Sequence, residues 1–75
     1  MSHAIDRYQR LIADPGALAI PSGTWRGMAR ELTWHYEQHA DARPAMARVY
    51  MLAAADCEDR ARAAERLATL TAVRS

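Results

Sequence analysis

Two histidines at helical spacing are the first residues of this chain that could do chemistry. His35 and His39 are four residues apart, which places both imidazoles on one side of a helix and suits a metal ion. The zinc-protease pattern needs a glutamate directly after the first histidine, whereas Glu37 would point about 200° away from His35. Further ligands would have to come from Cys57 or His3, and a histidine pair alone is a weak site. We therefore predict no metal site and no cofactor.

The single cysteine, Cys57, is the candidate nucleophile. A reactive thiol needs an electropositive and partly open setting, but the neighbours Asp56, Glu58 and Asp59 are acidic and would raise its pKa. We expect a small buried residue instead. The sequence also has no Ser-His-Asp arrangement, no paired carboxylates in an apolar setting and no glycine-rich phosphate loop. With no catalytic set to assemble, we predict that the protein is not an enzyme.

The C-terminal third carries an arginine stripe that could bind phosphate, formed by Arg60, Arg62, Arg66 and Arg74. We expect a solvated face instead, because Glu58 and Asp59 lie four and three residues before Arg62 and can pair with it. The chain has ten basic and nine acidic residues, whereas a dedicated nucleic-acid binder carries a clear basic excess. Nucleic acid is therefore an unlikely partner. A helical nucleic-acid-binding regulator that uses Arg43 and Arg48 is the alternative function.

Trp34 is the residue that best indicates a binding surface. It lies nine residues after Trp25, about two and a half turns, so the two rings point out of opposite helix faces. The apolar stripe of this helix contains Trp25, not Trp34, and a large ring on a polar face usually has to be covered. The cover could come from this chain or from another one. The neighbours of Trp34 on its face are Arg30, Glu37, Gln38 and Gly27.

Three helices must position these residues, at about residues 2–13, 22–42 and 44–72. Ser2 can cap the first helix, and Ser22 or Thr24 can cap the second. The turn at residues 14–16 uses Gly16, which permits a positive φ. In the link that follows, Leu18 and Ile20 are expected to pack onto the bundle.

The third helix carries an unusual seam of mostly small residues. The seam consists of Met46, Tyr50, Ala53, Cys57, Ala64, Leu67 and Thr71, flanked by Ala61 and Ala68. Small side chains let a neighbouring helix approach closely, but each buries little apolar area. Arg60 also falls in the seam, and Asp56 four residues earlier can pair with it. Estimated from the rise per residue of an α-helix, the first two helices placed end to end are about as long as the third, so both could pack along it.

The fold class that follows is all-α: a small bundle of two or three helices, with the long alanine-rich C-terminal helix packed antiparallel on the second. Residues 1–75 form one domain at most. With one cysteine, no signal-peptide pattern and no apolar run of membrane length, we expect a complete cytoplasmic protein. All ten basic residues are arginine, and lysine, phenylalanine and asparagine are absent, which indicates a high-GC bacterial or phage genome.

The leading function is a non-enzymatic interaction factor that binds another protein, or itself, through the face around Trp34. One concrete version is a phage or mobile-element accessory protein that inhibits a host defence system. A homo-oligomeric structural module is a further alternative. The core of so short a chain is thin, so burying Trp34 against a partner would help more here than in a larger protein.

Overall fold

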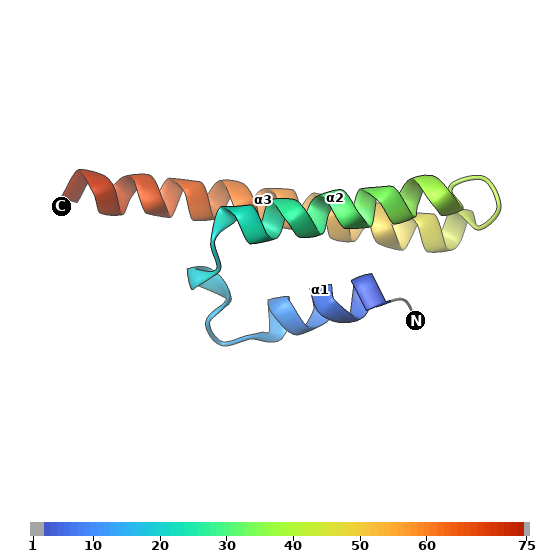
Figure 1. Ribbon diagram of the computed structural model, residues 1–75, viewed down its shortest axis with the longest axis horizontal. Coiled ribbons are helices and arrows are strands. Elements are labelled where there is room, and N and C mark those ends of the chain that lie inside the picture. The colour runs from blue at the N-terminus through green and yellow to red at the C-terminus, as the bar shows by residue number, and fades with distance from the viewer. Residues whose placement is uncertain (1–2, 75) are drawn as a thin grey trace.

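The protein is a long helical hairpin with a short helix on one side, as the computed structural model in Figure 1 shows for residues 3–74. Its elements are α1 (His3–Ala13), a 3-10 turn η1 (Ala17–Ala19), α2 (Ser22–His39) and α3 (Pro44–Arg74). No strand occurs in residues 3–74. The long α3 packs antiparallel on α2 (Figure 1), so the predicted all-α fold is confirmed.

The two ends of α2 differ from the prediction. The capping position of α2 is Pro21, which makes no side-chain cap hydrogen bond, so the predicted caps Ser22 and Thr24 are wrong. The helix ends at His39, three residues before the predicted end, and the backbone N–H of Arg43 donates to the His39 carbonyl at 2.9 Å. Pro44 restricts the residue before it, Arg43, to non-helical geometry, which accounts for the break before α3 but not for the three residues by which α2 ends early. Ser2 lies outside the described residues.

The turn between α1 and η1 is built by a side chain. The N–H of Gly16 donates to Oδ1 of Asp14 at 2.8 Å, which is the local hydrogen bond that aspartate favours in turns. Gly16 has a φ of −91°, so the predicted use of positive φ is wrong. Ile20 packs against the core as predicted. Leu18 does not, because it is 85% exposed.

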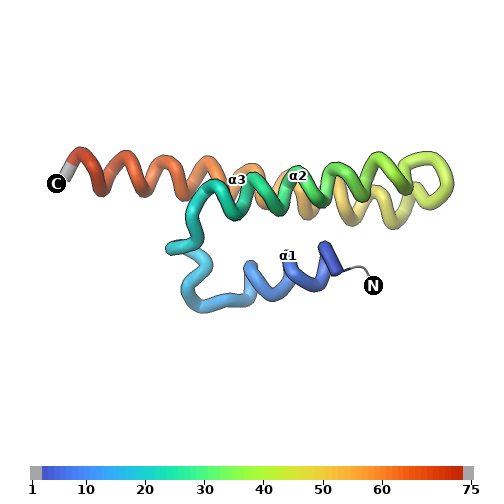
Figure 2. Tube along the Cα trace, viewed as in Figure 1, coloured from blue at the N-terminus to red at the C-terminus, as the bar shows by residue number. Residues whose placement is uncertain are grey.

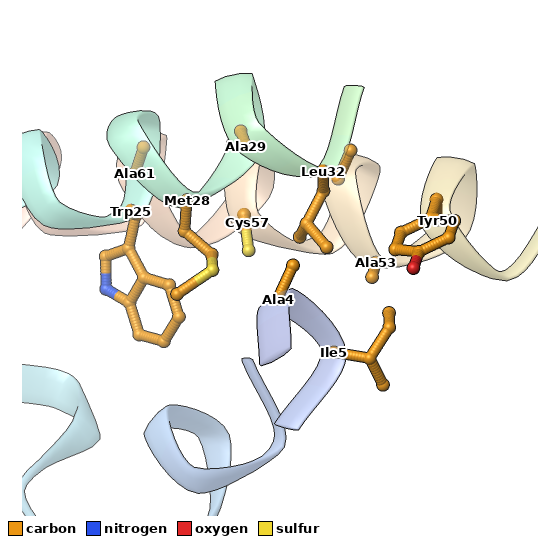
Figure 3. Close-up of a cluster of buried hydrophobic side chains, with 11 residues drawn as sticks. Ala4, Ile5, Trp25, Met28, Ala29, Leu32, Tyr50, Ala53, Cys57 and Ala61 are labelled. Carbon is orange, nitrogen blue, oxygen red and sulfur yellow. The ribbon is translucent and has the colours of Figure 1, made fainter. Parts of the chain in front are cut away.

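The core lies where all three helices meet, and Figure 3 shows its side chains pointing inward from each of them. From α3 it receives Tyr50, Ala53, Cys57 and Ala61, all almost fully buried, so the middle of the predicted seam is confirmed. From α2 it receives Trp25 and Leu32, which with Cys57 are the largest fully enclosed side chains. The α1 contribution is Ala4 and Ile5. The small side chains Ala53, Cys57 and Ala61 of α3 thus leave room for larger side chains of α1 and α2 to pack against them.

The two ends of the predicted seam are not buried. Met46 is 40% exposed and Leu67 55% exposed, and Thr71 is exposed too. At the C-terminal end, the reason is the place of α1, which lies beside α2 and not end to end with it (Figure 2). With α1 folded back, α3 extends past both other helices, and every residue from 65 to 73 is exposed. We call residues 65–73 the α3 overhang.

Ion pairs and hydrogen bonds tie the helices together. Arg26 of α2 pairs with Glu58 at 3.1 Å and also with Glu65, both on α3. Arg7 of α1 pairs with Glu31 of α2. Of the two partners predicted for Arg62, Asp59 is confirmed, whereas Glu58 pairs with Arg26 instead. All these groups are about a third or more exposed, so each pair adds little stability.

Candidate interaction surface

The two tryptophans of α2 lie in opposite environments. Trp25 is 1% exposed and Trp34 is 57% exposed. Both come from one helix with one period, so the polar surroundings of Trp34 follow from its place in the helix. In the part of the chain that the structure describes, no element covers the Trp34 ring. Of the two covers that the sequence left open, residues 3–74 provide only a partial one, since they leave Trp34 57% exposed.

A chain of ring contacts holds Trp34 in place. The His35 ring lies edge-on to it, with centroids 5.0 Å apart and planes at 86°. His35 in turn stacks on Tyr50 of α3, with centroids 5.0 Å apart, and Tyr50 is only 2% exposed. Edge-to-face and offset-stacked pairs are the favourable aromatic geometries. Trp34 is therefore an exposed ring that rests on a side chain anchored in the core.

The rim of the Trp34 surface is polar and unpaired. Arg30, Glu37 and Gln38 are all exposed. Across residues 3–74 none of their three side chains makes a hydrogen bond or ion pair. A Cβ added at Gly27 would lie 4.0 Å from Nη2 of Arg30, which is an ordinary van der Waals contact. We call Trp34, Arg30, Glu37, Gln38 and Gly27 the Trp34 surface.

The histidine pair serves packing in this structure. His39 stacks on the same Tyr50 ring as His35, at 5.7 Å between centroids, so both imidazoles use their faces against one buried phenol. Within residues 3–74, no group of three or more histidine, cysteine or acidic side chains is close enough to hold a metal ion. The two histidines, whose spacing suits a metal ion, instead connect α2 to the N-terminal part of α3 by stacking on Tyr50.

Cys57 is enclosed, with an exposed fraction of 0%. Burial, with a smaller contribution from the charge of Asp56, raises the pKa of its thiol to about 11. A thiol with that pKa is protonated at neutral pH and is a poor nucleophile. This is the small buried seam residue that the sequence predicted.

A polar cluster beside Cys57 was only half visible in the sequence. Oδ2 of Asp56 accepts hydrogen bonds from Nε of Arg60 at 2.8 Å and from the Tyr8 hydroxyl of α1 at 2.7 Å. The guanidinium of Arg60 lies 5.3 Å from the centre of the Trp25 ring, within the range of a cation–π contact. The Asp56–Arg60 spacing predicted one of these contacts. Tyr8 is 48 residues away along the chain, and no local signal could have assigned it.

The cluster shifts three pKa values. Burial first, and then the hydrogen bond to Asp56, raise the pKa of Tyr8 to about 12. Partial burial opposes ionisation of Asp56, but the hydrogen bonds from Arg60 and Tyr8 outweigh it and lower the carboxyl pKa. The hydrogen bond to Asp56 raises the pKa of Arg60. The charge states at neutral pH are thus ionised Asp56 and Arg60 and a neutral phenol. The cluster fastens α1 to α3.

The residues of the alternative nucleic-acid surface are exposed near the closed end of the hairpin. Arg43 lies in the turn and Arg48 in the second turn of α3. Along α3, Arg60 is bound to Asp56 and Arg62 to Asp59, so two members of the arginine stripe are neutralised by neighbours. Residues 3–74 include no helix that is long and apolar enough to cross a membrane.

No family model, curated protein or solved structure matches this chain.

Proposed function

We propose that this protein is a non-enzymatic interaction factor that binds another protein through the Trp34 surface. The observation that carries the proposal is the 57% exposed Trp34 ring held edge-on by His35. Tryptophan is among the residues most enriched at binding hot spots. An exposed ring that is already held in one orientation loses less side-chain entropy on binding than a free one.

The rim supports a protein partner in particular. Protein interfaces combine an apolar centre with a polar rim, and Arg30, Glu37 and Gln38 surround Trp34 with hydrogen-bonding groups that have no partner in residues 3–74. Arg30 and Glu37 carry opposite charges, so the rim favours a partner with charges of both signs. The finer version, in which a phage or mobile-element accessory protein inhibits a host defence protein, rests on size and composition alone and stays a prediction.

The test has two stages. Tagged wild-type protein and the Trp34→Ala variant are used for affinity capture from a lysate of the source organism, and partners retained only by the wild type are identified. Binding of the purified partner is then measured by calorimetry. Trp34→Ala should weaken it by about 2 kcal/mol or more, roughly 30-fold in Kd. The melting temperature should change little, because the ring contributes little to the core.

Two further variants make the measurement specific. Leu52→Ala removes a side chain of similar exposure, 56%, from α3 outside the Trp34 surface and should leave Kd unchanged. His35→Ala keeps the tryptophan but removes its support, and should weaken binding less than Trp34→Ala does. If Trp34→Ala and Leu52→Ala have equal effects on Kd, the Trp34 surface is not the binding site.

A further inference from the structure

α1 is the shortest of the three α-helices and contributes least to the core. It has 11 residues, whereas α2 has 18 and α3 has 31. Its buried residues are Ala4 and Ile5, and Tyr8, Leu11 and Ile12 pack against the core partly buried. An isolated helix of this length is marginal in water. The helical structure of α1 therefore depends on its contact with the other two helices.

α2 and α3 are held to each other by contacts of their own. At the closed end of the hairpin, both imidazoles of α2 stack on Tyr50 of α3. Nearer the start of α2, Arg26 pairs with Glu58 of α3 at 3.1 Å. The hairpin thus has contacts between its two helices at both ends of α2, and these contacts do not involve α1.

The polar contacts of α1 form a separate set that lies near the surface. The Tyr8 hydroxyl donates to Oδ2 of Asp56 on α3 at 2.7 Å, and Arg7 pairs with Glu31 of α2. The side chains of Arg7, Glu31 and Asp56 are each at least a third exposed. Elements with a small buried area and solvent-exposed polar contacts open locally before the whole protein unfolds. α1 has both features.

The side of the hairpin on which α1 lies holds its most enclosed side chains. Cys57 of α3 and Leu32 of α2 are both 0% exposed. Figure 3 shows both side chains pointing to the α1 side, with Ala4 of α1 pointing towards them. When α1 leaves, a thiol and an apolar face of the hairpin become accessible.

We propose that α1 is a detachable cover, which undocks as a unit from an intact α2–α3 hairpin and thereby controls access to Cys57. The Tyr8–Asp56 hydrogen bond is the contact that keeps the cover closed. Residues 14–21 are the hinge, because hydrogen bonds such as that from the Ala17 N–H to the Asp14 carbonyl, at 3.0 Å, join residues of this link to one another. The ring contacts of Trp34 belong to α2 and α3, so the cover is independent of the function proposed for the Trp34 surface.

Labelling of Cys57 with an aromatic disulfide measures the opening. Cys57 is the only cysteine of the chain, so each coloured thiolate that is released reports one labelled site. The labelling rate of the wild type is measured at neutral pH over a range of urea concentrations. The slope of its logarithm against urea increases with the surface that opening exposes. We expect a shallow slope at low urea and, near the unfolding transition, the steep slope of global unfolding.

Hydrogen exchange followed by mass spectrometry locates the opening. The amides of α1 should show the same free energy of opening as Cys57 labelling does. The amides of residues 50–61 in α3 should be more strongly protected, because they exchange only when the hairpin itself opens. This difference separates undocking of α1 from separation of α2 and α3.

A matched pair of tyrosine variants tests the contact that keeps the cover closed. Tyr8→Phe should speed the labelling of Cys57 at low urea by about 2- to 12-fold, which corresponds to the net contribution of one hydrogen bond. Tyr36→Phe removes a phenol of α2 that packs against the core but has no contact with Asp56 in residues 3–74. It should leave that rate almost unchanged, since the hairpin keeps its packing when α1 undocks.

Three results would overturn the proposal. The first is labelling of wild-type Cys57 with the full urea slope of global unfolding at every urea concentration. The second is equal protection of the amides of α1 and of residues 50–61. The third is an equal increase of the labelling rate in Tyr8→Phe and Tyr36→Phe. Circular dichroism confirms that both variants have the helix content of the wild type.

Discussion

The two halves of α3 have similar side chains and opposite surroundings. In the half that faces α1 and α2, Ala53 and Ala61 are 5% and 0% exposed. In the overhang, Ala68 and Ala72 continue the same face and are exposed. Since the side chains along this face are similar, the burial of an α3 residue depends on whether α1 or α2 lies beside it. A small-residue seam thus shows that a helix can be approached closely, but not which helix does so or over what length.

The largest effect should come from filling the seam where it is already packed. Ala61→Leu should lower the free energy of unfolding by about 1–3 kcal/mol, because the added atoms have no space beside Trp25 and α2. Ala68→Leu, measured by urea denaturation, should stay within about 0.5 kcal/mol of the wild type. Equal losses for both variants would show that the overhang is packed in the monomer.

The sequence predicts well whatever depends on local period. The three helices, the buried middle of the seam and the outward direction of Trp34 all follow from 3.6-residue spacing. The position of α1 does not, because an amphipathic stripe gives no direction in space. The end-to-end placement of the first two helices was the simplest arrangement for their lengths, and it left no reason to expect Leu67 or Leu18 at the surface.

The same limit applies to the candidate surface. The direction of Trp34 and its polar rim could be predicted from its neighbours along α2, but the sequence left open whether another part of the chain covers the ring. Its support could not, because the contact of His35 with Tyr50 joins two helices. The histidine spacing indicated metal chemistry, and only the tertiary structure shows that both rings stack on one phenol.

An intermediate effect on stability should come from the contact between Tyr8 of α1 and Asp56 of α3. Tyr8→Phe removes the hydroxyl that donates to Asp56 at 2.7 Å and should destabilise the fold by about 0.5–1.5 kcal/mol. It should also flatten the alkaline loss of stability. The pKa of Tyr8 is raised to about 12, so its contribution is complete below pH 10 and falls as the pH rises towards 12.

Denaturant titration from neutral to alkaline pH measures both parts of that prediction. Tyr36→Phe is the control, since it removes a phenol of α2 that is partly buried against the core but makes no contact with Asp56 in the described residues. A wild type and a Tyr8→Phe variant of equal stability at neutral pH would show that the hydrogen bond does not hold α1 in place.

The smallest effect on stability is expected in acid. It compares Asp56, which contacts α1, with Asp59, which faces solvent. The folded-state pKa of Asp56 is below its ordinary value of 3.8, so the carboxylate stabilises the fold at higher pH, and this stability is lost as pH falls below about 4 through the folded pKa. Asp56→Asn should therefore reduce the loss of stability between about pH 5 and pH 2. The effect is modest because the side chain is 37% exposed and partly screened by solvent.

Asp59→Asn is the comparison, since Asp59 also pairs with an arginine of α3 but is 71% exposed, and it should leave the acid profile almost unchanged. If the two variants alter the profile equally, the hydrogen bonds from Arg60 and Tyr8 add nothing beyond an ordinary surface pair, and α1 is held by its apolar residues and the Arg7–Glu31 pair.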